Sequence, residues 1–269
     1  MSSGSRKSLT AVLDMVDETV ADGADGHKLA DDLFAVVGVL DSEPMLNRAL
    51  TEPAVPVEAK TSMLHSLFEG KVGVAALTVV EVAVKRRWSR GGDLSNGIER
   101  AAITAIAAHA DDAGKLDDLE DELFRFGRIL ESEPELREAL TDAAAPLEAK
   151  RELLHSLLSR KAGRATLALL DQLVVGRHRT LMSGLAYYQT VAAARREMLL
   201  ATAWVAAPLS EEHKLRLTGA LAAQYSQQVH LNVVIDADVL GGVRVAIADD
   251  VIDSSVESRL TDAHRRLIH

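Results

Sequence analysis

Apolar residues recur every three or four positions along about the first 200 residues. The most regular stripe contains Leu116, Leu119, Leu123, Phe126 and Leu130. This spacing places the apolar side chains on one side of an α-helix. Similar stripes predict neighbouring helices over residues 103–113, 134–140, 146–158, 166–175 and 181–200. Residues 166–175 are nearly all apolar, so we expect that helix to be central.

The pattern changes after Leu200. Residues 201–207 alternate weakly, and a capped helix is expected over residues 210–225. Residues 229–235 then alternate at strand spacing, and residues 243–247 and 251–253 predict two more extended segments. The glycine pair at residues 241–242 indicates a positive φ or a close approach of the backbone. A last helix is expected from Ser254 or Ser255 to Leu267.

The chain contains a gapless internal repeat. When the sequence is shifted by 90 residues, residues 31–87 fall on residues 121–177 with about 26 identities in 57 positions. Ser42-Glu43-Pro44 falls on Ser132-Glu133-Pro134, and Leu64-His65-Ser66-Leu67 falls on Leu154-His155-Ser156-Leu157. Further upstream, residues 8–12 resemble residues 102–106 at an offset of 94. The repeat predicts two copies of one helical plan.

These patterns predict a mainly α protein with two tandem helical bundles followed by a small α/β domain with a short sheet. We expect an additional, diverged bundle over residues 1–97, a second bundle over 98–200, and the α/β domain over 201–269. The chain is long enough for each part to bury a core of its own.

Composition excludes several functional classes. The chain has a formal net charge of −10, whereas a general nucleic-acid interface needs a basic surface, so no nucleic-acid partner is expected. It has no cysteine, which excludes disulfides, thiolate catalysis and cysteine-based zinc sites. No run reaches the roughly 18 apolar residues that a membrane span requires. The N-terminal sequence MSSGSRKSLT lacks an apolar signal core. We therefore expect a cytoplasmic protein that reaches a membrane only through a partner.

No group of residues indicates catalysis or a bound cofactor. The nine histidines form no compact ligand set, and His65 and His155 occupy equivalent repeat positions where a structural role is the simplest interpretation. The basic run Lys85–Arg90 fits either a helix end whose cations meet the negative dipole or a contact for an acidic partner. Trp204 fits either a packing residue or a contact residue. An enzyme is not expected, and neither is a metal or a cofactor.

An ordered series of residues near the end of the chain resembles the C-terminal signature of ATP synthase delta subunits, the bacterial relatives of the oligomycin-sensitivity-conferring protein. The matching residues are Asp236, Leu240, Gly241, Gly242, Ile252, Asp253, Ser255, Val256, Arg259 and Leu260. The family often has glycine at the position of Ser254. A phosphate-binding loop is the rival interpretation of the glycine pair, but the chain has no G-x-x-x-x-G-K-S/T motif.

The second copy carries the rest of the resemblance. Residues 98–200 are similar to the family's N-terminal helical domain, down to a late arginine followed by leucine and tyrosine, here Arg177, Leu181 and Tyr188. Residues 205–210, VAAPLS, resemble the junction before its C-terminal domain. Residues 1–97 are an addition, and the chain looks similar to the longer delta subunits of high-GC Gram-positive bacteria.

The resemblance implies a non-catalytic subunit of the peripheral stalk, or stator, of the F-type ATP synthase on the cytoplasmic face of the cell membrane. It would link the α3β3 hexamer to the membrane-anchored subunit b, so that proton-driven rotation is coupled to ATP synthesis. The helical domain would bind N-terminal segments of α subunits, and the C-terminal signature would belong to the part that binds b. Apolar positions on the first and fifth helices of the second copy are the candidate groove for α, namely Ile103, Ile106, Leu167 and Leu170.

The additional copy could bind a second α terminus, brace subunit b or lengthen the stalk, and bracing of b is the role that we expect. The alternative to a stator subunit is a non-catalytic helical-repeat adaptor of another complex, because stacked helical repeats form extended binding surfaces.

Overall fold

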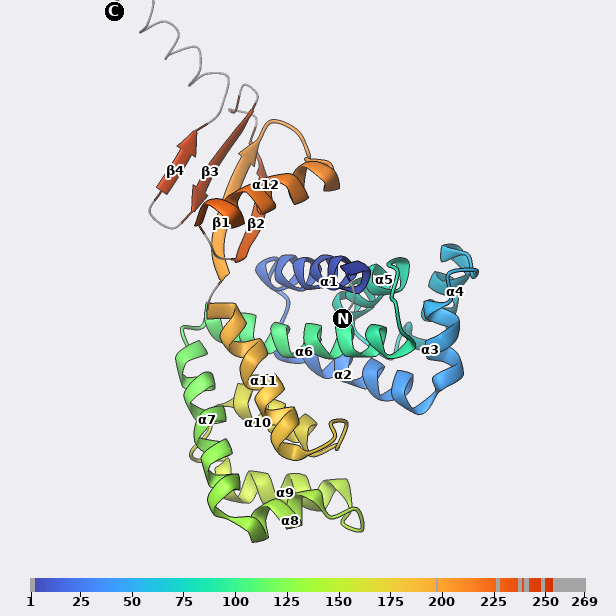
Figure 1. Cartoon of the computed structure of the whole chain (residues 1–269), viewed down its shortest axis with the longest axis vertical. Helices are drawn as coiled ribbons and strands as arrows, with labels where there is room; N and C mark the ends of the chain where they lie inside the picture. The colour runs from blue at the N-terminus through green and yellow to red at the C-terminus, as the bar shows by residue number, and fades with distance from the viewer. Residues whose placement is uncertain are drawn as a thin grey trace, which may run out of the picture. The chain divides into compact units, whose positions relative to one another are not determined.

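The computed structural model describes residues 3–196, 198–225, 228–236, 239, 242–247 and 250–253. The chain divides into two compact units, Met1–Arg196 and Glu197–His269. The first unit is helical, and the second contains a sheet with one helix among its described residues (Figure 1). The prediction of a mainly α protein with a small C-terminal α/β part is therefore confirmed. None of the described helices is long and apolar enough to cross a membrane.

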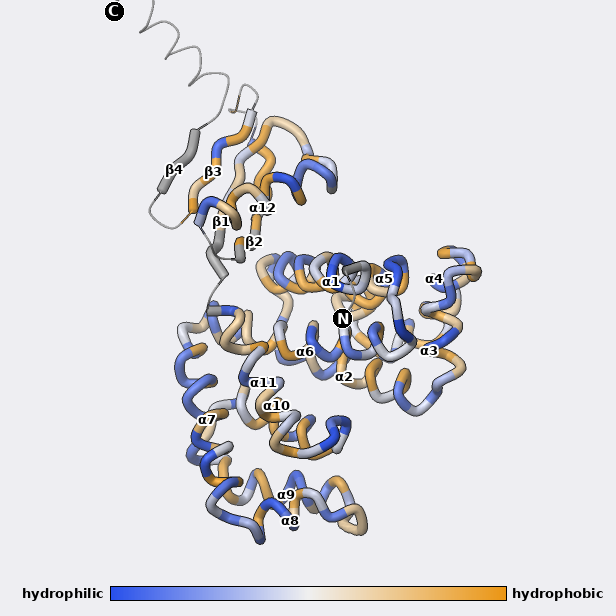
Figure 2. Tube along the Cα trace, in the orientation of Figure 1, coloured by the Kyte–Doolittle hydropathy of each residue, from blue (hydrophilic) through white to orange (hydrophobic). Residues whose placement is uncertain are grey.

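The described part of the first unit consists of short and medium helices joined by tight loops. They are α1 (Ser3–Ala21), α2 (Gly26–Ser42), α3 (Pro44–Thr51), α4 (Val57–Phe68), α5 (Val74–Lys85), α6 (Gly91–Asp112), α7 (Leu116–Ser132), α8 (Pro134–Thr141), α9 (Leu147–Leu158), α10 (Arg164–Leu173) and α11 (Leu181–Arg196). The predicted stripe of α7 faces inward, and Figure 2 shows strongly hydrophilic residues between its apolar ones. Gly114 follows α6 with φ of +64°, as expected for a helix end.

The internal repeat is visible in the helix boundaries. Helices α2 to α5 begin 90 residues before α7 to α10, so that Pro44 and Pro134 occupy the first positions of α3 and α8. The loops before α5 and α10 are fixed in the same way. The Asp32 carboxylate accepts the Gly73 amide at 2.9 Å, and the Glu122 carboxylate accepts the Gly163 amide at 2.8 Å. The two copies therefore share local interactions as well as sequence.

Helix α6 belongs to both copies. Its start at Gly91 lies 90 residues before the start of α11 at Leu181, which makes it the last helix of the first copy. Its later residues correspond to α1, which makes it the first helix of the second copy. The predicted boundary between residues 97 and 98 lies inside α6, and the two copies fall in one compact unit. The division of the chain into three domains stays a prediction.

Helix α6 is also the centre of the helical unit, while α10, which covers most of residues 166–175, contacts α2, α6, α7, α9 and α11. Helices α1, α2, α3, α5, α7, α10 and α11 all contact α6 (Figure 1). Its alanines allow these helices to approach closely: a Cβ added to Gly26 of α2 would lie 2.5 Å from the Ala105 carbonyl oxygen. Alanine and glycine thus let α6 be buried on nearly all sides.

The second unit has a four-stranded sheet of mixed direction, with strand order β2-β1-β3-β4. Its elements are β1 (Met198–Val205), α12 (Glu211–Tyr225), β2 (Gln228–Ile235), β3 (Val243–Ile247) and β4 (Asp250–Asp253). Strands β1 and β2 are parallel, with α12 as their crossover, while β3 pairs antiparallel with β1 and β4. The helix expected over 181–200 ends earlier, because residues from Met198 on pair with β2.

Helix α12 packs against one side of the sheet. Its Leu221 joins a small core with Ala201 and Ala203 of β1 and with Val245 and Ile247 of β3. The Ser210 hydroxyl accepts the His213 amide at 3.3 Å, which supports the expected cap of α12. The last predicted helix lies outside the described residues.

Candidate interaction surfaces

Arg177, in the loop after α10, is the centre of a polar cluster between the two copies. Its Nε donates to Asp41 of α2 at 2.6 Å. Its Nη1 donates to Glu99 of α6, and its Nη2 donates to Asn96 at 2.8 Å and to Ser95 at 3.1 Å. One guanidinium thus joins the first copy, the shared helix and the second copy. We call this group the Glu99–Arg177 cluster.

Burial dominates the electrostatics of this cluster. The Glu99 side chain is 2% exposed and also lies 2.9 Å from His178 Nε2. Burial raises the pKa of Tyr187 to about 12 and also raises that of Tyr188, and the nearby charge of Glu99 adds to both shifts. Burial opposes the charge of Arg177, but its hydrogen bond to Asp41 and the Glu99 carboxylate raise its pKa above the usual value. The cluster therefore holds a paired charge away from water, which suits a structural joint.

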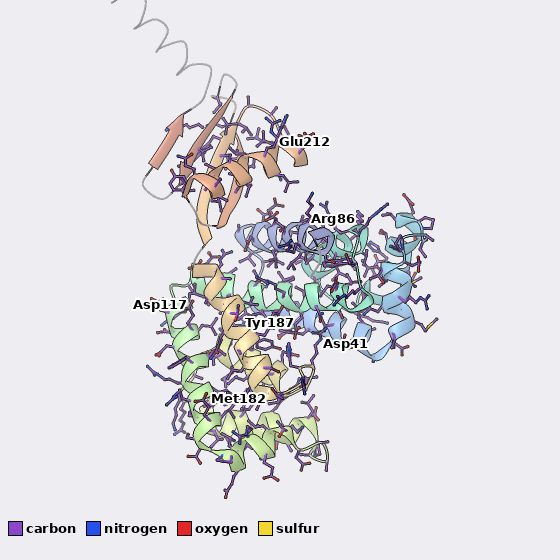
Figure 3. All side chains as sticks on the ribbon, in the orientation of Figure 1. Asp41, Arg86, Asp117, Met182, Tyr187 and Glu212 are labelled. Carbon is purple, nitrogen blue, oxygen red and sulfur yellow. The ribbon has the colours of Figure 1, made fainter. Side chains whose placement is uncertain are left out.

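Next to this cluster, a broad groove of about 1410 Å³ opens between the copies. Asp41 of α2 and Tyr187 of α11 line it from different elements (Figure 3). The rim of the groove carries three exposed cations, Arg48, Arg90 and Arg179. They stand out because the net charge of the chain is −10. The groove therefore favours an acidic group over a basic one.

A second joint ties the end of α11 to the first copy. Arg195, which is 8% exposed, donates from Nη1 to Asp17 of α1 and from Nε to Asp111 of α6 at 3.2 Å. Asp17 is 4% exposed, so this pair is also buried. Charge pairs with both partners buried are costly to break, which ties α1 and α11 to one another.

A pair of histidines lies where α2 meets α6. The rings of His27 and His109 stack edge to face, with centroids 5.0 Å apart. His27 is 6% exposed, and burial lowers its pKa, with further lowering by the charges of Arg164 and His109. Asp25, which caps α2, partly offsets these effects. His27 is thus held in its neutral form at a contact between helices.

The candidate groove on the first and fifth helices of the second copy has to be corrected. Ile103, Ile106 and Leu170 are 0% exposed and belong to the main core, and Leu167 is only partly exposed. For Ile103 and Ile106 the reason is the additional copy, because α1 and α2 cover α6. These positions therefore serve packing in this chain, and a contact between α6 or α10 and another subunit stays a prediction.

The repeat-equivalent histidines and the basic run have local partners. His155 Nε2 lies 2.8 Å from Asp171, and His65 Nε2 lies 3.6 Å from the equivalent Glu81. Lys85, at the end of α5, pairs with Glu81 at 2.6 Å. Trp88 is buried and donates from Nε1 to the Ala83 carbonyl at 2.8 Å. These contacts favour the structural interpretation of both features.

The described residues of the C-terminal signature form turns and strand ends. Asp236 extends the pairing of β2, since its amide donates to the Val205 carbonyl at 2.9 Å, and it begins the expected turn. Gly242 has φ of +84°, which fits the positive φ indicated by the glycine pair. Asp253 is the last residue of β4 and lies opposite Arg244 of β3 in the strand register. Leu240, Gly241, Ser255 and Arg259 lie outside the described residues.

The side of the sheet away from α12 carries a small apolar and cationic patch. Trp204 of β1 lies between Val234 of β2 and Arg244 of β3 in the strand register. The Arg244 guanidinium lies 5.8 Å from the centre of the Trp204 ring. Trp204 is outside the small core of this unit, and Val234 is 43% exposed. An aromatic ring with a neighbouring arginine is typical of contact surfaces.

No group of three or more His, Cys, Asp or Glu side chains among the described residues could hold a metal ion.

Comparison with known proteins places this architecture in context. The family model described as "ATP synthase delta (OSCP) subunit" matches residues 98–267. A protein from Streptomyces avermitilis named "ATP synthase subunit delta" is 44% identical over 265 residues, covering 98% of this chain and 97% of that protein. A protein of the same name from Thermobifida fusca is 41% identical over 264 residues, covering 98% of both chains.

The relatives also share the part of the chain before the family match. A third protein of that name, from Frankia casuarinae, is 39% identical over 275 residues and covers 100% of both chains, so the first copy is included. Among solved structures, a chain from "Cryo-EM structure of Toxoplasma gondii mitochondrial ATP synthase hexamer, composite model" is 21% identical with a TM-score of 0.27, and covers 62% of this chain and 95% of that one. That structural similarity is too low to support an argument.

Proposed function

The chain belongs to the ATP synthase delta (OSCP) subunit family and is thus a non-catalytic stator subunit of the F-type ATP synthase, and we propose that its two units hold different neighbours. The helical unit binds α subunits of the α3β3 hexamer, and the C-terminal unit binds subunit b. A stator has to resist the torque of the rotor, so its contacts must be joined by a body that does not yield.

The helical unit is suited to this task because both copies share one core. One hydrophobic core contains residues from Leu9 in the first copy to Ala192 in α11. Helix α6, which belongs to both copies, contributes to it throughout. The Glu99–Arg177 cluster and the buried Arg195–Asp17 pair fix the copies to each other at two further places. A single close-packed body of this kind transmits load with little internal movement. This shared core is the observation that carries the proposal of a load-bearing role.

We place the contact with α on α1 and α5 of the first copy. These helices are the repeat equivalents of α6 and α10, and α6 is already covered. Leu13 of α1 and Leu77 of α5 pack against the core while remaining partly exposed, and Val74 at the start of α5 is 82% exposed. An apolar face between two helices suits an amphipathic helix of the partner.

We place the contact with b on the open side and edge of the C-terminal sheet. Strand β2 is an edge strand, and its Val234 and Ile235 are 43% and 61% exposed. Val234 lies opposite Trp204 of β1 on the open side, whereas Ile235 lies opposite Val205 at the end of this edge strand, directly before Asp236, the first residue of the family signature. The patch is small, so the signature residues beyond β3 are expected to complete the contact.

Site-specific photo-crosslinking of the full chain tests both placements. A photoreactive residue replaces Val74 or Ile235, and each variant is mixed with purified α3β3 and with the soluble part of b. We expect Val74 variants to crosslink to α and Ile235 variants to crosslink to b. A matched control replaces Leu157 on α9, which is 44% exposed and lies on neither surface. Binding without crosslinks at Val74 and Ile235, or with the two products exchanged, would refute the placements.

A further inference from the structure

The two copies differ sharply at one equivalent position. Phe34 of α2 and Phe124 of α7 lie 90 residues apart and occupy the same place in the repeat. Phe34 is 7% exposed, whereas Phe124 is 61% exposed. A phenylalanine that is more than half exposed on a stable helix is unusual, because burying it would remove a large apolar surface from water.

Acidic residues flank this phenylalanine in both copies. Asp31, Phe34 and Asp41 lie on one side of α2 at spacings of three and seven residues. The second copy repeats the pattern on α7 as Asp121, Phe124 and Glu131 (Asp117, labelled in Figure 3, marks the first turn of the same helix). The second copy thus keeps the complete stripe, although its central ring is uncovered.

The first copy shows what such a stripe binds. Helix α10 contacts α2, and the loop after α10 brings Arg177 to Asp41 at one end of the stripe. Burial raises the pKa of Asp31, the charge of Arg164 at the start of α10 opposes that rise, and Arg177 donates to Asp41 at 2.6 Å. Between these arginines, the α10 sequence is largely leucine and alanine. The segment next to the first stripe is therefore an apolar helix with a basic residue at each end.

The second stripe has room for such a segment. A groove of about 430 Å³ lies between α7 and α11, and Phe124, Gln189 and Ala193 line it together with Asp121. The two acidic residues of the stripe pair with neighbours on their own helix: Asp121 pairs with Arg125, and Glu131 pairs with Arg128 at 3.1 Å. Such exposed pairs are worth little, so an incoming arginine can replace them at small cost.

We propose that the stripe Asp121–Phe124–Glu131, together with the facing side of α11, is a docking site for a partner helix with an apolar centre and a basic residue at each end. A second copy of this chain cannot supply that helix from α10, since Leu169, Leu170 and Leu173 are buried in its own core. The site is separate from the surfaces on α1, α5 and the sheet, so it gives the helical unit a further contact.

The chain itself supplies the probe for a test. A labelled peptide of residues 163–179, GRATLALLDQLVVGRHR, reproduces α10 and the following loop, the segment that contacts α2 and pairs with Asp41. Its binding to the full chain is measured by fluorescence anisotropy. We expect saturable binding that Phe124→Ala weakens at least about tenfold, because the central ring is lost. Replacing both arginines of the peptide, Arg164 and Arg177, with glutamine is expected to weaken binding and to reduce its dependence on salt.

Two controls separate docking from folding. Phe124→Ala removes an exposed side chain, so helix content and thermal stability are expected to stay at the level of the unmodified chain. Leu157→Ala on α9 removes another exposed apolar side chain, 44% exposed, and is expected to leave peptide binding unchanged. The proposal is overturned if the unmodified chain does not bind the peptide, or if Phe124→Ala binds it as tightly.

Discussion

Replacing Arg177 with methionine tests whether the Glu99–Arg177 cluster holds the two copies together. Methionine keeps part of the aliphatic stem and removes the charge, which leaves the Glu99 carboxylate at 2% exposure with His178 and Tyr188 as uncharged or weakly charged neighbours. Removing one partner of a buried ion pair costs about 3–5 kcal/mol. The Arg177 side chain is 18% exposed and His178 stays in place, so we expect a loss of about 3 kcal/mol, at the lower end.

A second substitution tells whether the loss comes from the stranded carboxylate. Glu99→Gln removes the negative charge and keeps the size of the side chain. If Glu99 is what Arg177 neutralises, the double variant is expected to be about 1–2 kcal/mol more stable than the sum of the single changes predicts. Arg179→Met, two residues along the same loop and exposed, is the matched control and should change stability by less than about 0.5 kcal/mol.

The chain offers a convenient signal for the helical unit alone. It has two tryptophans, and Trp204→Phe leaves Trp88, which is 6% exposed in the helical unit. Urea unfolding followed by Trp88 fluorescence then reports the free energy of unfolding of that unit, and an unchanged slope would show that the unfolded states are comparable. A loss below about 1 kcal/mol for Arg177→Met, or strictly additive effects with Glu99→Gln, would refute the reasoning.

Three further predictions concern the helical unit and use the same fluorescence signal. Gly26→Ala places a Cβ 2.5 Å from a backbone oxygen of α6 and should cost about 1–3 kcal/mol, whereas Gly38→Ala meets no atom within 4 Å and should stabilise α2 by up to about 1 kcal/mol. The pKa of His27 is lowered in the folded chain, so the unfolded chain binds a proton at this imidazole more readily. The free energy of unfolding is therefore expected to fall as the pH drops below about 6.5, and His27→Gln should reduce that fall. Asp32→Asn and Glu122→Gln each weaken an acceptor for an equivalent loop amide and should cost about 1 kcal/mol, with the larger loss at Glu122 because it also accepts the Thr166 hydroxyl; a loss at Glu122 no larger than that at Asp32 would count against this ordering.

The sequence predicted the helices and the repeat because both depend on local information. The apolar spacing of α7, the proline at the start of α8 and the glycine after α6 act within a few residues of where they stand. The strands β1 to β3 could be predicted for the same reason, since their alternation reflects one covered side of the sheet.

The central position of α6 could not be predicted from such patterns. A helix with alanines on most sides has no clear apolar stripe, so its sequence does not distinguish a buried helix from an ordinary surface helix. The burial of Glu99 and Asp17 was missed as well, because isolated acidic residues usually lie at the surface. A signal was present for Glu99, since it stands with Arg100 between Ile98 and the apolar run that begins at Ala101.

The shared helix also changes what deletion of the first copy can show. Removing residues 1–90 would leave α6 intact but would uncover the side that α1 and α2 cover, including isoleucines and alanines that are 0% exposed in the full chain. A chain that folds with one copy needs polar residues on that side, and this chain lacks them. We expect the deletion variant to associate or aggregate, as measured by size-exclusion chromatography with light scattering. A monomer with intact helix content and cooperative unfolding would show that the second copy does not depend on the first. If the deletion variant associates, a loss of coupled ATP synthesis after deletion reports the loss of packing in the helical unit. Single substitutions at exposed positions such as Val74 then test the contact with another subunit without disturbing that packing.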